Sequence, residues 1–479
     1  MIILGIAICH NSSASLMING ELKGIIQEER LTRIKNQAGF PLLAVKSLIN
    51  HHLNGDFNAI DVVVAGSKFY DPYYYCIAKY TNYDVEDHIK EMKEVWYPHF
   101  YKNKAFNDAV WKKNFLNKHR LNKYHNFDFS FIKKDTSHAD AIKFFSDVEL
   151  FNPVKKILGS GIEYEKLDHH NCHAYYALYG GKLSDNKIKD TLILTADAMG
   201  DLRNWTVSIV KEDGELNELA SGNNFLVARI YKFITLILGM KPLEHEYKVM
   251  GLSAYSNSKK HIEKVEEVFF EILDFKEGDF YSISPLKDSY FDLKKRLEGF
   301  RFDNIAAALQ NWTSKVLIKW AEYWLKVTNK KGIAFSGGLS MNIKANGDLL
   351  QSKMVEWLSV PASGGDESLS AGACFLKAKS NKQKVFSISS PYLGDEAKFK
   401  DEEIFDRLVD TKYKKEDFIV IDNFDNSKIA KLLLKDNIIA RCVGRSEFGA
   451  RALGNRSILA NPKNQNNVKI INDNVKSRD

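Results

Sequence analysis

Residues 1–27 read MIILGIAICHNSSASLMINGELKGIIQ and contain three short apolar runs. Ile2–Cys9 is followed by a polar turn, Ala14–Ile18 is followed by Asn19-Gly20, and Leu22–Gln27 completes the pattern. Asn-Gly between two apolar runs is typical of a type I′ hairpin, because both residues tolerate a positive φ. The stretch therefore predicts a three-stranded β-meander.

The same order recurs at residues 191–220, TLILTADAMGDLRNWTVSIVKEDGELNELA. We expect a strand at Thr191–Ala196, a polar loop at Asp197–Arg203, a strand at Trp205–Val210, a hairpin at Asp213-Gly214 and a strand at Glu215–Ala220. Two such units in one chain indicate a duplicated α/β fold. Their polar loops would then face each other across a cleft.

The length of 479 residues predicts two or three domains. We place a main domain at 1–385, with an aromatic, lysine-rich helical insert at about 70–150, then a linker at 386–400 and a small α/β domain at 401–479. The insert's aromatic side chains are expected to form a small core of their own; the alternative is a wall that binds an acceptor. Other expected elements are helices at Lys259–Leu273, Asn304–Val327, Glu367–Lys377 and Lys428–Leu434, and strands at Ile333–Phe335, Trp357–Val360, Phe418–Ile421 and Ile438–Cys442.

The composition is that of a globular protein, with 44% hydrophobic and 27% charged residues. The apolar runs are too short to span a bilayer, and the N-terminus lacks the pattern of a signal peptide. Five scattered cysteines without a C-x-x-C pair argue against a disulfide scaffold. We therefore expect a soluble, reduced, cytoplasmic protein with no membrane partner. The net charge of +7 is spread along the chain, which disfavours nucleic acid and suits small anionic substrates.

Residues 168–173, DHHNCH, hold the sharpest candidate site. Asp168 suits a helix N-cap, and His169 and His173 are then four residues apart on one helix face. That spacing lets two imidazoles bind one metal ion, whereas His170 points elsewhere. An isolated pair of this kind is also common without a metal.

Two acidic residues extend this candidate site. Asp197 ends a predicted buried strand, and Asp366 lies between a glycine pair and a helix start. Both are positions at which open α/β sheets present ligands. A set of two His and two Asp suits iron, manganese or zinc. The alternatives are that Asp366 only caps its helix and Asp197 only holds a turn.

Gly337 and Gly338 follow a predicted strand and precede Asn342 and a predicted helix. Glycines at such a place let the backbone approach a nucleotide closely. The chain lacks both the P-loop and the G-x-G-x-x-G fingerprints, so those nucleotide-binding classes are excluded. The alternative for the Gly-Gly pair is an ordinary turn.

Charged residues supply the remaining candidates. Arg445, Arg451 and Arg456 lie close together among glycines, a pattern that suits an anion site; the alternative is a solvated basic turn. His10 follows a buried strand and could act as a general base on a hydroxyl. Lys35 could neutralise a phosphate or carbonyl oxygen, and for both residues the alternative is an ordinary surface group.

Together these residues resemble the O-carbamoyltransferases of the nodulation-protein and antibiotic-tailoring family. The resemblance covers nearly the whole chain and is carried by Leu4–Ser12, Glu29–Lys35, His169–Ala174, Glu246–Leu252, Gly337–Asn342, Pro361–Asp366 and Glu447–Ser457. It implies an actin-like ATPase (ribonuclease-H-like) N-terminal domain, related to the tRNA threonylcarbamoyl-transferring protein, and a YrdC-like C-terminal domain. Relatives continue beyond the end of this sequence, so the resemblance implies that 401–479 is only part of that second domain.

The resemblance also implies an activity. The C-terminal domain of such enzymes makes carbamoyl-adenylate from carbamoyl phosphate and ATP with Mg²⁺, and the N-terminal domain passes the carbamoyl group to a hydroxyl of a sugar or secondary metabolite. His169, His173, Asp197 and Asp366 would bind Fe²⁺, or Mn²⁺ or Zn²⁺ instead, and His10 would be the base. Other implied roles are carbamoyl-adenylate binding for Lys35, Gly337, Gly338 and Asn342, acceptor binding for Glu246 and Lys248, and carbamoyl phosphate or ATP binding for Arg445, Glu447, Arg451 and Arg456.

Two departures from the family pattern keep alternatives open. The loop at 363–368, SGGDES, lacks the glycine that relatives usually carry soon after the acid. The partial C-terminal domain makes a non-catalytic nucleotide-binding scaffold an alternative. A transferase of the tRNA threonylcarbamoyl type is a second alternative, which the C-terminal arginine segment disfavours. A homodimer is compatible with each of these.

Overall fold

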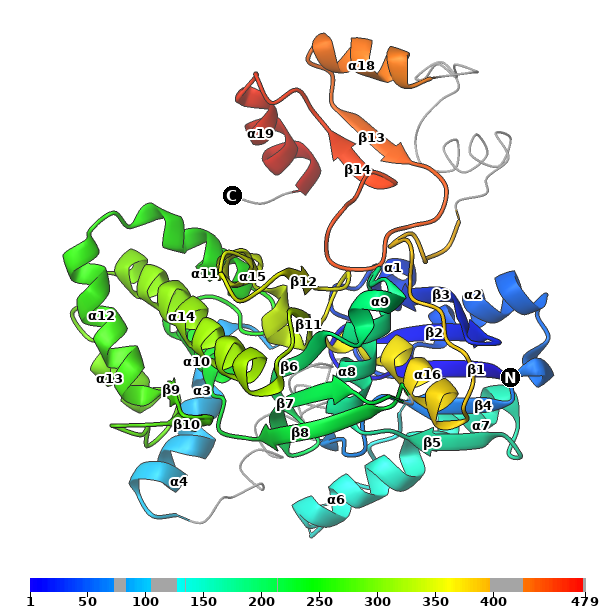
Figure 1. Ribbon diagram of the computed structural model, residues 1–479, viewed down its shortest axis with the longest axis horizontal. Helices are drawn as coiled ribbons and strands as arrows, with labels where there is room; N and C mark the ends of the chain where they lie inside the picture. The colour runs from blue at the N-terminus through cyan, green and yellow to red at the C-terminus, as the bar shows by residue number, and fades with distance from the viewer. Residues whose placement is uncertain (73–82, 105–126, 134, 213, 397–424, 477–479) are drawn as a thin grey trace. The chain divides into compact units, whose positions relative to one another are not determined.

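The computed structural model describes residues 1–72, 83–104, 127–133, 135–212, 214–396 and 425–476. The chain divides into two compact units, Met1–Ser389 and Ser390–Asp479. The N-terminal unit contains two five-stranded sheets (Figure 1).

Both sheets have the same strand order. The first runs β3-β2-β1-β4-β5 and the second β8-β7-β6-β11-β12. In each, three strands form an antiparallel meander and two more are added parallel to its first strand. The strands are β1 (Ile2–Ala7), β2 (Ser13–Ile18), β3 (Glu21–Gln27), β4 (Val62–Ala65) and β5 (Glu163–Lys166), then β6 (Thr191–Gly200), β7 (Arg203–Val210), β8 (Leu216–Gly222), β11 (Gly332–Ser336) and β12 (Trp357–Ser359).

This repeat confirms the predicted duplicated α/β fold, and the repeated sheet is the arrangement expected of an actin-like domain. Asn19 and Gly20 have φ values of 49° and 81°, as the predicted type I′ turn requires. The second predicted hairpin includes Asp213, which lies outside the described residues.

Strand β6 differs from the prediction because it does not end at Ala196. It continues to Gly200 through a break in register between Ala196 and Gly200. Asp197 therefore lies on an irregular part of the strand rather than in a polar loop. Such a bulge re-aims side chains, which periodicity alone does not reveal.

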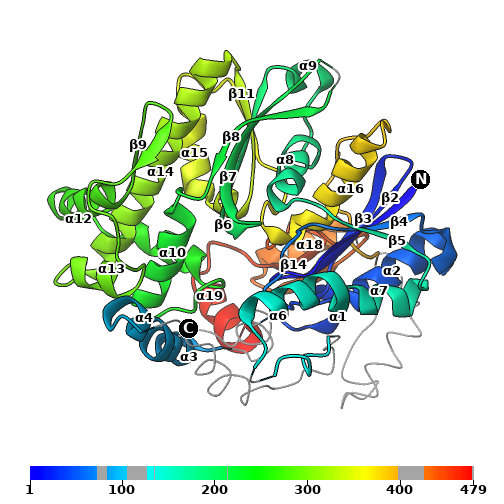
Figure 2. The same cartoon turned by 90° about the horizontal axis from the view of Figure 1, so that it is seen from below.

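Two helices, α8 (His169–Tyr179) and α16 (Leu369–Ser380), lie between the two sheets (Figures 1 and 2). Helix α8 packs on β6 and β11, α16 packs on β1, β2 and β4, and the two helices pack against each other. We call this helix pair the seam. A Cβ on Gly372 would overlap the carbonyl oxygen of Cys172, so glycine lets the two helices approach this closely.

Further helices cover the outer faces and complete two lobes, each with its own hydrophobic core. The first lobe has α1 (Glu29–Thr32), α2 (Leu42–Leu53), η1 (Phe57–Ala59) and α7 (Phe151–Leu158). The second lobe has α9 (Asp185–Ile188), α10 (Val227–Ile237), α11 (Glu246–Leu252), η6 (Ser253–Tyr255), α12 (Lys259–Ile272), the strand pair β9 (Asp274–Lys276) and β10 (Asp279–Tyr281), α13 (Phe291–Arg296), α14 (Phe302–Thr328), η7 (Gly338–Met341) and α15 (Ile343–Leu350). The short helix η8 (Asp366–Ser368) packs on α16 and β1.

The described part of the insert contains several helical segments, whereas residues 127–133 within it form no helix. It comprises α3 (Val85–Glu91), a π-helical turn η3 (Met92–Trp96), α4 (Tyr97–Tyr101), α6 (His138–Phe144) and a second π-helical turn η5 (Phe145–Glu149). The expectation that its aromatic residues form their own core is wrong for the described ones. Phe127 and Phe145 join the core of the first lobe, whereas Trp96 packs with residues of the second. Tyr73-Tyr74-Tyr75 and Trp111 lie outside the described residues.

The C-terminal unit contains α18 (Asn426–Leu434), the antiparallel pair β13 (Ile439–Cys442) and β14 (Arg456–Leu459), α19 (Asn466–Ile470) and a π-helical turn η10 (Ile471–Lys476). Part of the segment expected to be a linker packs within this unit. Gly394 N–H donates to Ser446, and Ser446 N–H donates to Asp395. The strand expected at Phe418–Ile421 lies outside the described residues, and a YrdC-like domain stays a prediction.

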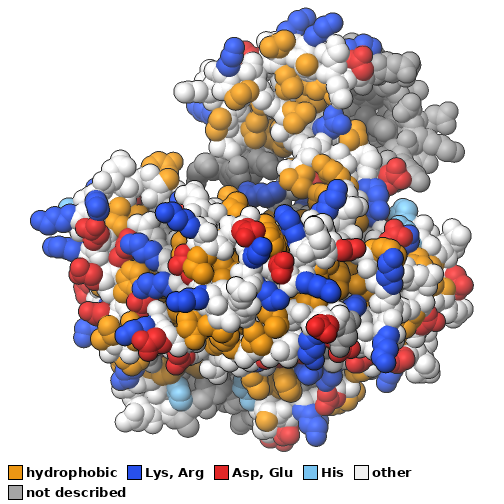
Figure 3. Space-filling view, in the orientation of Figure 1, with side chains coloured by type: hydrophobic (Ala, Val, Ile, Leu, Met, Phe, Trp, Pro, Cys, Tyr) orange, Lys and Arg blue, Asp and Glu red, His pale blue; other side chains and the backbone are white. Residues whose placement is uncertain are grey.

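On the face of the N-terminal unit in Figure 3, Lys and Arg side chains lie interspersed with Asp and Glu. Within the described segments, every helix is too short or too polar to cross a bilayer. The four described cysteines, Cys9, Cys172, Cys374 and Cys442, carry free thiols.

Candidate metal centre

The first turn of α8 carries two of the candidate ligands. Asp168 caps the helix by accepting a hydrogen bond from Asn171 N–H at 2.9 Å, as predicted. Four-residue spacing then places the rings of His169 and His173 side by side, with centroids 4.8 Å apart. Both imidazoles are buried, so the helix holds them away from bulk water.

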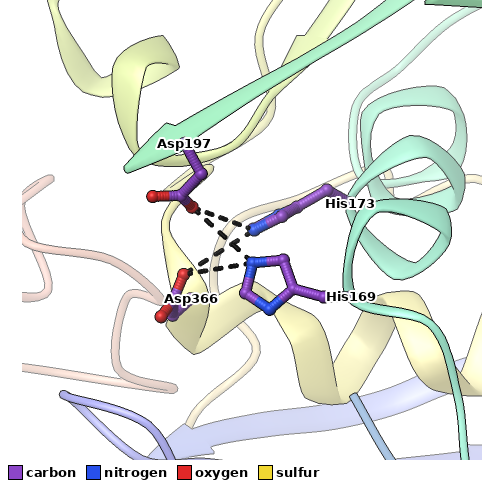
Figure 4. Close-up of side chains that lie close together, drawn as sticks. All are labelled: His169, His173, Asp197 and Asp366. Carbon is purple, nitrogen blue, oxygen red and sulfur yellow. Dashed lines mark ion pairs between the residues drawn. The ribbon is translucent and has the colours of Figure 1, made fainter. Parts of the chain in front are cut away.

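The second pair of candidate ligands comes from other elements. Asp197 extends from β6, and Asp366 begins the short helix η8 that leads into α16 (Figure 4). His173 Nε2 lies 3.3 Å from Asp197 Oδ2 and 3.7 Å from Asp366 Oδ1; His169 Nε2 lies 3.8 and 3.7 Å from the same two atoms. One donor atom from each of the four residues falls within 4.8 Å of the others.

The donor set fits a metal ion. Nε2 of His169 and Nε2 of His173 are buried and have no hydrogen-bond partner. Ser336 donates its hydroxyl proton to the Gly364 carbonyl, so the 3.3 Å contact between Ser336 Oγ and His173 Nδ1 favours an Nδ1–H donor. Nε2 of His173 then carries a lone pair that faces the carboxylates, as a ligand requires. Two imidazoles and two carboxylates suit Fe²⁺, Mn²⁺ or Zn²⁺.

Charge is concentrated at this cluster. Burial disfavours the charged imidazole of His169, but the Asp197 and Asp366 carboxylates raise its pKa to about 9. Burial opposes ionisation of Asp197 as well, yet the two adjacent imidazoles hold its pKa well below the ordinary range. The carboxylates therefore balance positive charge, whether it is carried by an imidazolium or by a metal ion.

His170 lies outside the cluster, as expected. Its Nε2 donates to the Arg203 carbonyl at 3.1 Å, and its Nδ1 lies 2.8 Å from Thr195 Oγ1. Burial, then the charges of His169 and His173, lower the pKa of His170 to about 3. It is a neutral residue that holds α8 against the second sheet.

The structure brings His10 to the cluster and pairs Lys35 with Glu244. His10 Nδ1 lies 3.5 Å from Asp366 Oδ2, with 30% of its side chain exposed. Lys35 Nζ lies 4.0 Å from Glu244 Oε2, and 62% of its side chain is exposed. The imidazole of His10 is thus more exposed than those of the candidate ligands His169 and His173.

The Gly337-Gly338 turn supports Asp197. Gly337 has a φ of 95°, and a Cβ there would overlap the carbonyl oxygen of Ala196. The N–H of Gly338 donates to Asp197 Oδ2 at 3.1 Å. Asn342, which was expected near a nucleotide, caps α15 by accepting from Ala345 N–H and also pairs with Gln310.

The two expected acceptor residues lie on α11. Glu246 is partly buried, accepts a hydrogen bond from Leu243 N–H at 2.6 Å, and has a pKa that burial raises. Lys248 is exposed.

In the C-terminal unit, the expected anion-binding residues organise their own loop. Arg445 donates to the carbonyls of Leu393 and Gly394, and Arg456 donates to several carbonyls, including that of Val443. Burial would raise the pKa of Glu447, but its carboxylate accepts three backbone N–H groups, of Leu453, Asn455 and Arg456, which lower it. Arg451 is exposed. Anion binding by these residues stays a prediction.

Sequence reasoning missed Asp201. Its carboxylate accepts hydrogen bonds from Ser67, Lys68, Phe69 and His169. An acid four residues after Asp197 was the only signal, and in sequence it looks like an ordinary loop residue. Its partners are more than 30 residues away in the chain, so only the fold reveals them.

The repeated sheets and the His–Asp cluster define a two-lobed α/β protein with a central site suited to a divalent cation. The chain belongs to the carbamoyltransferase family, because the model of the carbamoyltransferase N-terminus matches residues 2–375 and that of the C-terminus matches residues 430–479. The protein is therefore a transferase, and carbamoyl transfer is its general chemistry.

Several individual proteins are similar to this chain. An uncharacterized protein of Methanocaldococcus jannaschii is 27% identical over 501 residues, covering 96% of this chain and 76% of that protein. The nodulation protein NolNO of Sinorhizobium fredii is 28% identical over 323 residues, covering 65% of this chain and 45% of NolNO. Component A of the (R)-2-hydroxyglutaryl-CoA dehydratase of Acidaminococcus fermentans aligns with 80% of this chain and all of its own, at 11% identity and a TM-score of 0.38. That score is too low to define a shared fold by itself.

Proposed function

We propose that this protein is an ATP-dependent O-carbamoyltransferase. It moves a carbamoyl group from carbamoyl phosphate, by way of carbamoyl-adenylate, to a hydroxyl of a sugar or secondary metabolite. The observation that carries the proposal is the cluster of His169, His173, Asp197 and Asp366, with His10 beside it, in a chain of the carbamoyltransferase family.

Adenylation gives the reaction its driving force. A carbamoyl group is a poor electrophile, and attaching it to AMP provides a good leaving group. Carbamoyl phosphate, ATP and water give carbamoyl-adenylate, and inorganic phosphate and pyrophosphate are released. The acceptor oxygen forms the new bond to the carbamoyl carbon, the bond from that carbon to the AMP phosphate oxygen breaks, and AMP departs with the electron pair. The acceptor hydroxyl must lose its proton in the same step, so a base is needed.

His10 is the base in this proposal. Its ring lies at the cluster, with Nδ1 3.5 Å from Asp366, yet its side chain remains partly exposed, so an acceptor hydroxyl can reach it. The Asp366 carboxylate orients the ring and stabilises the imidazolium that forms when His10 takes the proton. Glu246 and Lys248 would bind the acceptor from α11.

His169, His173, Asp197 and Asp366 would hold the metal ion. A bound divalent cation supplies Lewis acidity to carbonyl and phosphate oxygens. Gly338 N–H and the paired imidazoles hold Asp197 in its ionised form ready for that cation. The Gly337-Gly338 turn, Lys35 and Asn342 would bind carbamoyl-adenylate; Arg445, Glu447, Arg451 and Arg456 would bind carbamoyl phosphate and MgATP.

The test separates the two half-reactions. The purified chain is incubated with ATP, Mg²⁺ and carbamoyl phosphate, and AMP-linked product and phosphate release are measured. A second reaction supplies carbamoyl-adenylate with a panel of hydroxyl acceptors. His173→Ala is the site variant, and His51→Ala, which changes an exposed histidine on α2, is the matched control.

We expect His173→Ala to abolish carbamoyl transfer from supplied carbamoyl-adenylate and His51→Ala to leave it unchanged. Turnover from carbamoyl phosphate and ATP would show that residues up to Asp479 suffice for adenylate synthesis. Equal transfer by wild type and His173→Ala would refute the assignment of the cluster.

A further inference from the structure

Residues 200–203, which join β6 to β7, contact the first turn of α8. The Asp201 carboxylate accepts a hydrogen bond from the backbone N–H of His169 at 2.8 Å. Arg203 pairs with the Asp168 cap, and the Arg203 carbonyl accepts from His170. The turn thus contacts three consecutive residues at the start of the helix.

The same carboxylate also reaches the other lobe. It accepts hydrogen bonds from Ser67 Oγ at 2.8 Å, Lys68 N–H at 2.9 Å and Phe69 N–H at 3.0 Å. These three residues follow β4 of the first sheet, whereas α8 packs on the second sheet. One side chain therefore ties the first residue of α8 to the opposite lobe.

Gly200 contacts the same histidine through a different atom. A Cβ on Gly200 would overlap the imidazole ring of His169, so the bare backbone of this glycine lies against the ring. The next two residues, Asp201 and Leu202, have φ values of 47° and 68°. Non-glycine residues adopt this left-handed conformation when their surroundings require it, and here it turns the chain around His169.

We infer that Asp201 is a positioning residue for His169, and that Gly200 also positions this histidine by lying against its ring. The inference rests on the proposed metal centre. The N–H of a first helical residue has no partner within the helix, so the start of α8 is free to fray unless an outside acceptor holds it. A carboxylate gives a charge-assisted hydrogen bond, which is stronger than a neutral one. Holding the backbone of His169 in this way holds the direction of its imidazole.

A carboxylate is required because the Asp201 side chain acts as the acceptor in each of its hydrogen bonds. An asparagine at this position offers one oxygen and an NH₂ group, and the NH₂ group would face N–H donors. We therefore expect Asp201→Asn to shift His169 and to weaken metal binding about 10- to 100-fold, as loss of a residue that orients a ligand commonly does.

A matched control exists at Asp288. This buried carboxylate accepts the N–H groups of Tyr290, Phe291 and Asp292 and the Tyr101 hydroxyl, so Asp288→Asn removes a comparable number of hydrogen bonds. It lies at the start of α13 and contributes nothing to the His–Asp cluster. A loss of stability alone would affect both variants in the same way.

The experiment uses the full chain and two metal probes. Zn²⁺ affinity is measured by competition with a chromophoric chelator, and the d–d absorption bands of bound Co²⁺ report ligand geometry. We expect Asp201→Asn to weaken Zn²⁺ binding and to change the Co²⁺ spectrum, while Asp288→Asn keeps wild-type values for both. Gly200→Ala, which crowds the same ring, is expected to change the Co²⁺ spectrum and serves if Asp201→Asn fails to fold.

The outcomes are distinguishable. If wild type binds neither Zn²⁺ nor Co²⁺, the proposed metal centre fails, and this inference fails with it. If wild type binds both ions and Asp201→Asn and Gly200→Ala each match wild type, the positioning role is overturned while the metal centre stands.

Discussion

Three histidines lie at the cluster, and their exposure separates their roles. The side chains of His169 and His173 are 4% and 0% exposed and present Nε2 atoms without hydrogen-bond partners, whereas the side chain of His10 is 30% exposed. A buried nitrogen without a partner is costly unless something binds it. An exposed imidazole beside a carboxylate is instead available for proton transfer to a substrate.

His10→Gln tests that separation at a single residue. Glutamine keeps a polar side chain but cannot serve as the base, so carbamoyl transfer from supplied carbamoyl-adenylate is expected to fall about 10²- to 10⁴-fold. Zn²⁺ affinity should stay within a few-fold of wild type, because His10 is not one of the four ligands. A parallel loss of Zn²⁺ binding would instead place His10 among the ligands.

Gly337 gives a second residue-scale prediction. Any side chain there meets both a positive φ and the Ala196 carbonyl, so Gly337→Ala is expected to lower the free energy of unfolding by about 2 kcal/mol or more. Gly347, in the middle of α15, has open space at its Cβ position, and Gly347→Ala should stabilise by about 0.5–1 kcal/mol. Urea denaturation of both variants checks the sign as well as the size; a stabilising Gly337→Ala would contradict the described turn.

At this scale much of the site could be predicted from sequence. The spacing of His169 and His173 determines their shared helix face, and Asp197 and Asp366 occupy positions where α/β sheets present ligands. The roles of Lys35 and Asn342 stay predictions. Lys35 pairs with Glu244 and Asn342 with Gln310, and such contacts with distant residues cannot be predicted from sequence. Asp201 was not predictable, because its role depends on four donors from distant segments.

At the scale of the elements, the N-terminus of α8 matters most, because it carries the ligand pair. Asp168→Ala removes both the cap and the ion pair with Arg203, whereas Asp168→Asn keeps a good cap and loses the charge. We expect a loss of about 1 kcal/mol or more in stability for Asp168→Ala and a smaller loss for Asp168→Asn. Chemical denaturation measures both, and equal losses would show that the ion pair outweighs the cap.

Helix α3 provides a pH-dependent prediction away from the cluster. Burial, then the charges of Lys232 and Lys241, lower the pKa of His88 to about 3, against the partial compensation of Asp87 and Asp84. The folded state therefore holds His88 neutral, and the unfolded state binds a proton as pH falls below about 6.5. Stability from this residue is complete above that pH and is lost progressively toward pH 3.

His88→Gln should remove this pH-dependent contribution to the free energy of unfolding. Between pH 7 and pH 5, wild type is expected to lose about 2 kcal/mol more of its unfolding free energy than His88→Gln does. Urea denaturation at the two pH values gives the comparison. A pH dependence that is identical in the two proteins would show that His88 titrates normally in the folded state.

At the scale of the elements, a feature could be predicted when a short sequence pattern determines it. The Asn19-Gly20 hairpin and the Asp168 cap follow from short-range rules, and both are found. The extension of β6 through a bulge was not predicted, because hydrophobic alternation shows where a regular strand stops and not where an irregular one continues. The aromatic residues of the insert were predicted as a separate core, since composition identifies residues that will be buried without showing which core they enter.

At the scale of the whole N-terminal unit, the cluster joins elements from both lobes. His169, His173 and Asp197 belong to elements packed on the second sheet, and Asp366 leads into α16 on the first. A ligand that binds only the folded state raises the free energy of unfolding by mass action. Saturating Zn²⁺ at about 100 times its Kd should therefore stabilise the protein by about 2.7 kcal/mol.

Removal of the metal should reverse the gain. Addition of EDTA to the loaded protein is expected to return the Tm to that of the metal-free protein, with no shift in His173→Ala. Differential scanning calorimetry with and without Zn²⁺ makes the comparison. An equal Zn²⁺-dependent rise in His173→Ala would place the binding elsewhere on the molecule.

The close contact between α8 and α16, the two helices of the seam, also limits how one lobe can slide past the other. Because Gly372 lies directly against the Cys172 carbonyl, sliding one helix along the other would bring larger side chains into a contact that admits only hydrogen. The glycine contact therefore fixes the position of α16 along α8. Because Asp366 begins the turn that leads into α16, the same contact also fixes how far this carboxylate lies from the imidazoles on α8.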